Sequence, residues 1–296
     1  MTAVAAGLAA DRLLGEPPAA VHPVVAFGRA MRAVEGVLHR DSRAAGVAHA
    51  TVGVGLGIAA GRLVRSAAVA TWLAVAGRAL ERAALEVAAA LDAGDVDRAR
   101  ALLPALVGRD PADLDEKEVA RAVVESVAEN TVDAVVAPAC WALVAGAPGA
   151  LGYRAVNTLD AMVGHRSPRY ERYGWASARL DDVAGWVPAR VTAALVAAAR
   201  PRSAAAVWTA VRTQAPAHPS PNAGVAEAAF AAALGLRLGG ESRYGDRVEI
   251  RPPLGTGRPA EPADIARAVA LARDVGALSV VMSAISARIT TRNAPK

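Results

Sequence analysis

The sequence predicts an all-α protein, and its composition gives the reasons. Hydrophobic residues make up 54% of the 296 residues, which leaves ample apolar surface for burial. Aromatic residues contribute only 4%, so the apolar bulk consists of Ala, Val, Leu and Gly, small residues that let helices pack closely in membranes. Alternation typical of strands persists only over short stretches such as Val248–Arg251.

Two segments are the best candidates for crossing a membrane. Ala44–Gly61 and Ala134–Tyr153 contain no Asp, Glu, Lys or Arg, and each approaches the roughly 20 residues that a spanning helix needs. Three apolar segments are shorter: Ser66–Gly77, Val191–Ala199 and Val275–Ala287. A buried helix of a soluble protein has the same pattern, so this alternative stays open beside the favoured membrane protein.

The chain is predicted to form one domain over residues 1–296. It shows no internal repeat and no low-complexity linker long enough to separate domains. Loops or helix boundaries are expected where Gly and Pro gather: 94–95, 108–111, 216–221 and 252–262.

The charge pattern argues against a nucleic-acid-binding protein. The formal net charge is +5, but the arginines are dispersed and the only lysines are Lys117 and Lys296. No basic block with interleaved aromatics occurs, and a basic balance also suits a membrane protein or a site for anionic substrates. Cys140 is the only cysteine, which excludes an intrachain disulfide and a cysteine-based zinc cluster.

A row of charged residues precedes the second apolar segment. A helix places on one face residues spaced by four, here Arg121, Glu125, Glu129 and Asp133, with Asn130 adjacent. Like charges at this spacing repel, so a bound cation or ligand would stabilise the row. The alternative is an ordinary solvated helix face.

A second polar group follows that apolar segment, between Tyr153 and Arg190. Helical spacing places Asn157 and Asp160 on one face, and a second face carries acids and arginines in alternation: Arg179, Asp182 and Arg190. Asp181 and Asp182 are adjacent and resemble the carboxylates that hold Mg²⁺ with phosphates and waters. Surface carboxylates paired with nearby arginines are the alternative.

A third group lies between His218 and Gly240. Asn222 is predicted to cap a helix whose first turns carry Glu227, and the start of such a helix offers N–H groups to an anion. His22 and His218 each precede a proline and lack the spaced partners of a metal site, so structural roles are expected for both. Phosphate-loop, dinucleotide-binding and nucleophile-elbow motifs are absent from the sequence.

Eight stretches together resemble one known family: DRLLGEPP, HPVVAFGR, GRD, ESVAENTVDAVVAP, YRAVNTLDAMVGH, YGWASARLDDVAGWVPAR, SPNAGVAEA and ALGLRLGG. In this order, from about Asp11 to Gly240, they resemble the signatures of adenosylcobinamide-phosphate synthase, the CobD/CbiB family of cobalamin biosynthesis. Gly185 departs from the pattern, since members often carry Asn there, which argues against an essential amide at this position.

The resemblance implies a multi-pass integral membrane helical protein that catalyses an ATP-dependent amide ligation. The expected substrates are adenosylcobyric acid, a corrinoid, and 1-amino-2-propanol or its O-phosphate, between which the sequence does not decide. ATP and Mg²⁺ are the implied cofactors, because phosphorylation of the propionate to an acyl phosphate would supply a good leaving group.

Site roles follow as hypotheses from the resemblance. Asp181 and Asp182 are expected to hold Mg²⁺, with help from Glu129 and Asp133, and the catalytic acids and bases are Glu125, Glu129, Asp133 and Glu227. Substrate or nucleotide binding is assigned to Asn130, Asn157, Asp160, Arg179, Arg190 and Asn222.

The expected location is the cell membrane, with the polar regions 78–133 and 153–190 facing the cytoplasm, where ATP is found. The implied partners are the substrates, the lipid bilayer, and a second copy of the chain or later membrane enzymes of the cobalamin pathway. Two other classes stay open: a small-molecule transporter, for which acids at the ends of apolar helices are expected, and an intramembrane prenyltransferase, which uses acidic diphosphate-binding motifs.

Overall fold

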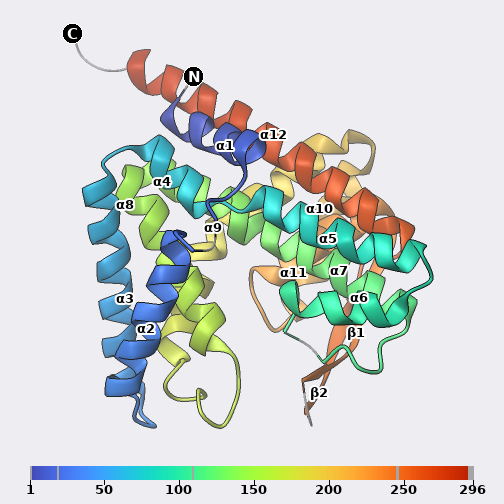
Figure 1. Cartoon of the computed structure of the whole chain (residues 1–296). Coiled ribbons are helices and arrows are strands. Elements are labelled where there is room, and N and C mark those ends of the chain that lie inside the picture. The colour runs from blue at the N-terminus through green and yellow to red at the C-terminus, as the bar shows by residue number, and fades with distance from the viewer. Residues whose placement is uncertain (1, 19, 109, 245–246, 293–296) are drawn as a thin grey trace. The chain divides into compact units, whose positions relative to one another are not determined.

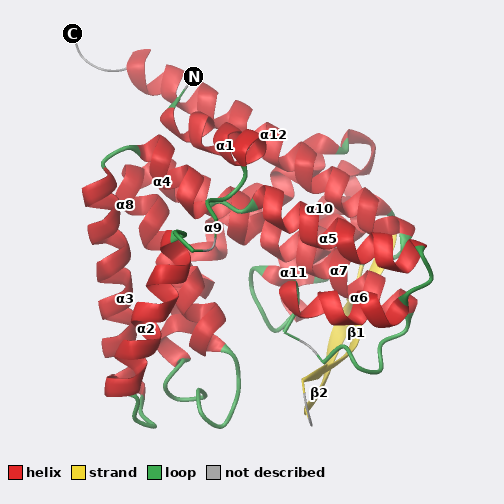
Figure 2. Cartoon of the chain, in the orientation of Figure 1, coloured by secondary structure: helices red, strands yellow, loops and turns green. Residues whose placement is uncertain are grey.

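The computed structural model describes residues 2–18, 20–108, 110–244 and 247–292, and helices make up most of it (Figure 1). Strands are confined to one small sheet, as the yellow segments of Figure 2 show. The predicted all-α class is confirmed, with this sheet as its one addition among the described residues.

The helices and strands have the following bounds: α1 (Ala3–Leu14), α2 (Pro23–Leu38), α3 (Arg43–Val64), α4 (Ala67–Ala74), α5 (Gly77–Asp92), α6 (Val96–Leu102), η1 (Leu103–Ala105), α7 (Glu116–Thr131), η2 (Val132–Val136), α8 (Ala137–Leu159), η3 (Asp160–Gly164), α9 (Trp175–Ala199), η4 (Pro201–Ser203), α10 (Ala204–Thr213), η5 (Ala215–Ala217), α11 (Ala223–Leu234), β1 (Leu236–Tyr244), β2 (Arg247–Leu254), β3 (Arg258–Pro259) and α12 (Ala263–Arg292).

Four helical stretches of the described chain are long and apolar enough to cross a membrane: Arg43–Val64, Glu116–Gly164, Trp175–Ala199 and Ala263–Ile285. The predicted span Ala44–Gly61 lies within the first of them. The shorter segments 191–199 and 275–287 are parts of the longer helices α9 and α12. The fold is therefore that of a multi-pass helical membrane protein, as the sequence predicted.

The second predicted span, Ala134–Tyr153, is not one unbroken helix. Ala145 and Gly146 leave helical geometry inside α8, with φ of −132° and +62°. Glycine adopts a positive φ without the steric cost that a side chain brings, and helical geometry resumes at Ala147, with Pro148 in the first turn. The absence of charge predicted an apolar segment correctly, but it carried no information on this break.

The contacts divide the chain into two compact units, each made of separate stretches. Unit 1 comprises 1–76, 133–188 and 279–296, and unit 2 comprises 77–132 and 189–278. Helices α9 and α12 contribute residues to both units. No linker separates the units in sequence, and the predicted single domain stays a prediction.

In unit 1, α3 packs closely against the second half of α8 (Figure 1). Three glycines of α3 make the contacts: Gly53 meets Leu159, Gly57 meets Leu151 and Ala155, and Gly61 meets Ala147 and Pro148. The helices are antiparallel, because the numbers rise along one and fall along the other. A Cβ at Gly57 would lie 2.7 Å from the Leu151 carbonyl oxygen, so only glycine permits this approach.

In unit 2, β1 and β2 form an antiparallel hairpin beside α11, and the strand order is β2-β1-β3. The pairing of β1 with β2 is irregular between Leu238 and Gly240, where Gly239 and Gly240 have φ of 86° and 101°. This bulge requires backbone conformations that glycine adopts readily. The strand pattern noticed at Val248–Arg251 is confirmed as part of β2.

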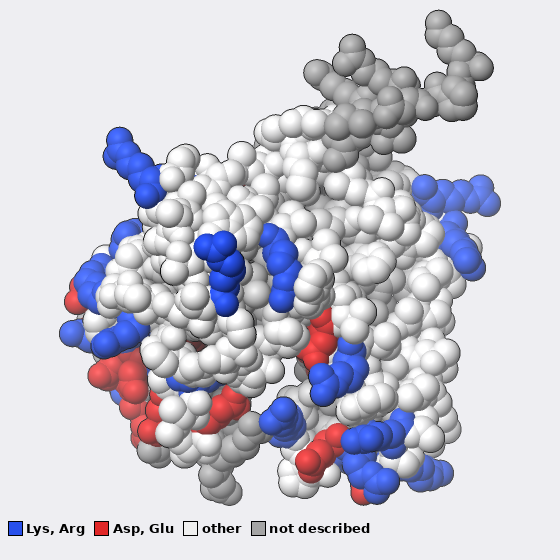
Figure 3. All heavy atoms as spheres, turned by 180° about the vertical axis from the view of Figure 1, so that it is seen from behind, with Lys and Arg blue, Asp and Glu red and all other residues white. Residues whose placement is uncertain are grey.

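The face drawn in Figure 3 is mostly free of charged side chains. Acids and arginines gather toward its edges, with isolated arginines between them. Exposed apolar side chains are numerous on α3 and α9, among them Val52, Leu56, Val183 and Val187. Such a surface is suited to contact with lipid.

Candidate functional site

Five of the twelve predicted site residues belong to two polar clusters, one in each unit. The unit 1 cluster consists of Asp133, Tyr153, Arg154, Asn157 and Asp181. The unit 2 cluster consists of Glu125, His218, Glu227, Glu249 and Arg251.

The unit 1 cluster is a set of hydrogen bonds among side chains of η2, α8 and α9. The Tyr153 hydroxyl donates to Asp133 Oδ1 at 3.2 Å. The Asn157 amide donates to Asp181 Oδ1 at 3.4 Å, and its oxygen accepts from Arg154 at 3.4 Å. Acids that are 48 residues apart in sequence are thus held beside one tyrosine and one amide.

Two predicted site acids lie in π-helical segments of unit 1. Asp133 belongs to η2 and Asp160 to η3, where the hydrogen bonds run from residue i to i+5. Short π-helical segments occur frequently at functional sites. They also change the helix phase, which spacing arguments from the sequence assume to be constant.

The predicted row of acids does not form one continuous face. Glu125 is buried with only 2% of its surface exposed, whereas Glu129 on the same helix is exposed. Spacing by four drifts around an α-helix by about 40° per step, and the π-helical segment adds a further shift before Asp133. The residues therefore occupy different surroundings.

Asp181 and Asp182 also point to different partners. Asp181 accepts from Asn157, whereas Asp182 Oδ2 lies 3.3 Å from Arg179 Nη1 on the exposed side of α9. Neighbouring residues on a helix diverge by about 100°, so the two carboxylates have different surroundings, and their predicted joint role in holding Mg²⁺ stays a prediction. Asp181 lies in the polar cluster, as a metal-binding role would require. Asp182 is paired with an arginine, as the alternative of a surface carboxylate predicted.

His22 and Glu16 lie close to the unit 1 cluster. His22 precedes α2, and its Nδ1 accepts from the Val24 N–H at 3.2 Å, which confirms the structural role predicted for it. Its Nε2 lies 3.8 Å from Glu16 Oε2. Burial lowers the pKa of His22, and the positive charge of Arg154 lowers it further.

In unit 2, Glu227 is fully buried on α11 and faces two basic side chains. Its Oε1 lies 3.7 Å from His218 Nε2 and 3.6 Å from Arg251 Nη1. Arg251 Nε also lies 3.7 Å from Glu249. Burial lowers the pKa of His218, and the Arg251 charge adds to this, whereas a backbone hydrogen bond at Ser220 and the nearby acids oppose it.

Glu125 holds the bulge of the β-hairpin. The Gly239 N–H donates to Glu125 Oε1 at 2.9 Å, and Arg121 Nη1 lies 3.9 Å from the same oxygen. Arg121 also donates to the carbonyl oxygens of Gly239 and Glu241. Arg121 and Glu125, both on α7, therefore hold the backbone of β1 in place at Gly239 and Glu241.

The start of α11 is correctly predicted, but its cap is not. Asn222 is the N-cap residue, yet its side chain makes no capping hydrogen bond. Its Oδ1 accepts from Arg190 Nη1 at 3.3 Å, and Ser220 Oγ accepts from the Ala223 N–H at 3.2 Å instead. Asn130 donates to the Ser126 carbonyl oxygen one turn earlier, at 2.9 Å.

The fit to Mg²⁺ depends on the donors that the unit 1 cluster offers. Among the described residues, no group of three or more His, Cys, Asp or Glu side chains is arranged to hold a metal ion. Mg²⁺ is commonly held by one or two carboxylates, with waters and substrate phosphates completing the shell. Asp133 and Asp181 provide hard oxygen donors of this kind, so the cluster fits Mg²⁺ as a site completed by phosphate oxygens.

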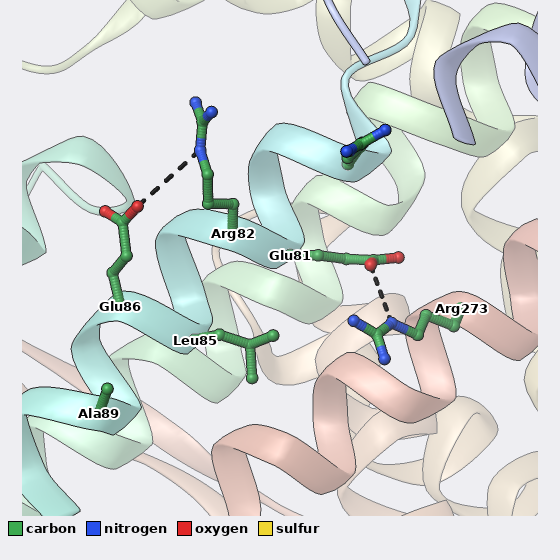
Figure 4. A pocket seen from close by; sticks show the side chains of 7 residues that line it. Glu81, Arg82, Leu85, Glu86, Ala89 and Arg273 are labelled. Atoms are coloured by element: carbon green, nitrogen blue, oxygen red, sulfur yellow. Dashed lines mark hydrogen bonds and ion pairs between the residues drawn. The ribbon is translucent and has the colours of Figure 1, made fainter. Parts of the chain in front are cut away.

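A hollow of about 440 Å³ on unit 2 lies between α5 and α12 (Figure 4). Glu81 points toward Arg273, with 2.8 Å between Oε2 and Nε, and Glu86 lies 3.9 Å from Arg82. None of the predicted site residues lines this hollow. Its acids and arginines are paired along exposed helix faces.

Sequence reasoning missed four members of the clusters, Tyr153, Arg154, Glu249 and Arg251, and also the nearby Glu16. Arg154 had one available signal, because it is the first charge after a long uncharged segment. His218 was singled out but assigned only a structural role, since its contact with Glu227 depends on the turn between η5 and α11.

The fold and its clusters define a multi-pass helical membrane protein with ionisable side chains buried inside it. The profile of the family described as CobD/Cbib protein matches residues 4–272. The chain belongs to this family.

Curated relatives agree with that assignment. The cobalamin biosynthesis protein CobD of Mycobacterium tuberculosis is 49% identical over 293 residues, which cover 94% of this chain and 92% of the relative. The protein of the same name from Rhodobacter capsulatus is 50% identical over 206 residues, covering 69% and 65%. That from Pelobacter propionicus is 40% identical, covering 86% and 84%. No solved structure matches the chain.

Proposed function

We propose that this protein acts in cobalamin biosynthesis as an ATP-dependent ligase. It joins a propionate carboxylate of adenosylcobyric acid to the amine of 1-amino-2-propanol or its O-phosphate. Family membership supports the pathway, and the relatives carry it in their names. The observation that supports the reaction is the unit 1 cluster, in which three family motifs supply two hydrogen-bonded pairs, Tyr153 with Asp133 and Asn157 with Asp181.

The reaction needs an activated carboxylate, because an anionic carboxylate is a poor electrophile and hydroxide is a poor leaving group. A carboxylate oxygen attacks the γ-phosphorus of ATP and ADP departs. The amine then attacks the acyl carbon, phosphate departs, and a base takes the amine proton. Mg²⁺ held by Asp133 and Asp181 would neutralise phosphate charge.

The remaining roles follow from the surroundings of each residue. Arg154 is bonded to the Asn157 amide and suits a phosphate oxygen, since arginine presents several donors in fixed geometry. Arg179 and Arg190 remain proposed phosphate ligands. Glu125 and Glu227, both buried in unit 2, remain the proposed candidates for the acceptor of the amine proton.

Turnover of purified protein tests this proposal. The protein in mild detergent is incubated with ATP, Mg²⁺, adenosylcobyric acid and either amino-alcohol, and the corrinoid product is identified by mass. We expect one ADP and one phosphate for each amide formed, and the ratio of kcat/KM for the two amines identifies the natural acceptor. A transporter would accumulate substrate in vesicles without turnover, and a prenyltransferase would release diphosphate from a prenyl donor; either result contradicts the ligase.

The cell membrane is the proposed location, with the polar regions facing the cytoplasm. Cysteines introduced beside Asp110 and Arg169 should resist an impermeant external reagent in intact cells and react after lysis. Ready labelling in intact cells would reverse this topology. A second copy of the chain and later membrane enzymes of the pathway remain proposed partners.

A further inference from the structure

An apolar groove of about 660 Å³ runs along α3 and α9 within unit 1. Its walls include Val47, Val54 and Ile58 from α3 and Trp175, Leu180 and Val183 from α9. Val183 is 76% exposed and Leu180 is 42% exposed, so the groove opens onto the surface of two membrane-spanning helices. Apolar side chains this exposed in a spanning helix face lipid.

The length of the groove corresponds to one leaflet of a bilayer. Val47 and Ile58 are separated by about 17 Å along α3, at 1.5 Å per residue. The hydrocarbon core of a bilayer is about 30 Å thick, so this length is close to half of it. One acyl chain covers such a distance, whereas a whole helix 10–12 Å wide would occupy on the order of 1,500 Å³ over it.

One end of the groove is positively charged. Arg43, the first residue of α3, stacks over Trp175, the first residue of α9, with 5.1 Å between the guanidinium carbon and the ring centre. Tryptophan and arginine at helix ends are typical of the membrane interface. The amino ends of both helices meet here, and their dipoles favour a negative group.

At this end of the groove, Arg43 is available to bind an anion. Among the described residues, Arg43 forms no ion pair, and its guanidinium lies over the Trp175 ring. Arg179, which lines the groove one turn farther along, lies 3.3 Å from Asp182 and is partly neutralised by it. Arg43 is therefore the cation that a headgroup meets first.

We propose that the groove binds one anionic glycerophospholipid. One acyl chain lies along α3 and α9, and the phosphate of the headgroup lies beside Arg43. The apolar walls recognise the chain, and the arginine with the two helix ends selects a negative headgroup over a zwitterionic one. This lipid site is independent of the ligase reaction.

Native mass spectrometry provides the test. The protein is purified in mild detergent and incubated with equal amounts of dioleoylphosphatidylglycerol and dioleoylphosphatidylcholine, and bound lipids are counted. Val54→Trp and Val183→Trp fill the groove from either wall. Val52→Trp is the matched control, because Val52 is 40% exposed on the same helix and does not line the groove. Arg43→Gln removes the headgroup contact.

The parent and Val52→Trp should retain one phosphatidylglycerol, favoured about fivefold over phosphatidylcholine, the effect of one arginine at an anionic surface. Both groove-filling variants should lose this lipid, and Arg43→Gln should bind either lipid equally. The proposal is wrong if the parent shows no preference or if both groove-filling variants keep the lipid. It is also wrong if the control loses the lipid, or if filling the groove dissociates a dimer and leaves lipid binding unchanged.

Discussion

The two polar clusters differ in what surrounds their carboxylates. In unit 2, Glu227 lies beside His218 and Arg251, and Glu125 lies beside Arg121 and a backbone N–H. In unit 1, Asp133 accepts from a tyrosine hydroxyl and Asp181 from an amide, and the positive charge of Arg154 interacts with Asp133. Cationic partners neutralise a carboxylate, whereas neutral partners orient it without removing its charge. The larger loss of stability is therefore expected from removing a unit 2 acid, whereas the metal role of the unit 1 acids belongs to the proposed function.

The largest effect is expected from Glu227→Gln, measured as the free energy of unfolding in mild detergent. The change keeps the size of a fully buried side chain but leaves His218 and Arg251 without the negative charge between them. Breaking a buried ion pair from one side costs about 3–5 kcal/mol. A loss below 1 kcal/mol would mean that the unit 2 cluster does not stabilise the fold. The contrast between the two clusters would then be wrong.

Asp181→Asn should lower turnover at least 100-fold while the unfolding temperature stays close to that of the parent. A 100-fold loss corresponds to about 2.7 kcal/mol, more than an exposed ion pair contributes. Raising the Mg²⁺ concentration should restore part of the rate. Asp182→Asn is the matched comparison, and since Asp182 pairs with an exposed arginine, its loss should stay below tenfold. Equal effects in the two variants would contradict the separation of the two carboxylates.

Lowering the pH is expected to reduce the free energy of unfolding by a smaller amount. One histidine in each unit contributes to this loss. Burial is the main cause that lowers the pKa of His22 in unit 1 and of His218 in unit 2 below 6.5. The unfolded chain therefore binds protons first as the pH falls, so stability is complete above pH 6.5 and declines through the window below it. Unfolding measured from pH 7.5 to 5.5 should show this decline.

Replacing either histidine by Asn should flatten part of that pH dependence. If the profile of His218→Asn matches that of the parent, the residue titrates alike in the folded and unfolded states. Its burial beside Glu227 would then have no energetic consequence in this range. The His22→Asn variant separates the contribution of unit 1 from that of unit 2.

The smallest effect is expected from Glu86→Gln, the control for both clusters. Glu86 is more than half exposed and lies 3.9 Å from Arg82. Exposed pairs at this helical spacing contribute about 0.3–0.5 kcal/mol, so stability should change by no more than this and turnover should not change. A large loss of turnover would show that the hollow between α5 and α12 takes part in function.

Composition predicted the all-α class, whereas the apolar segments left a soluble protein open and the family resemblance was needed to predict a multi-pass membrane protein. The helix starting after Asn222 and the short strand pattern at Val248–Arg251 were also predicted, since both depend on local sequence. Local signals could not reveal that Glu125 bonds Gly239, because 114 residues separate them and the contact depends on a bulge in the hairpin. The π-helical segments that carry Asp133 and Asp160 were missed for a related reason, since their sequences resemble ordinary helix.

The glycine contacts of α3 also limit how this protein can move. Each of the three glycines lies against backbone or methyl groups of the second half of α8, with no space for sliding by a fraction of a turn. The two helices are therefore expected to move together. Flexing is more readily accommodated where the helical geometry is already interrupted, at Ala145 and Gly146, which makes this break the natural hinge for the helix pair.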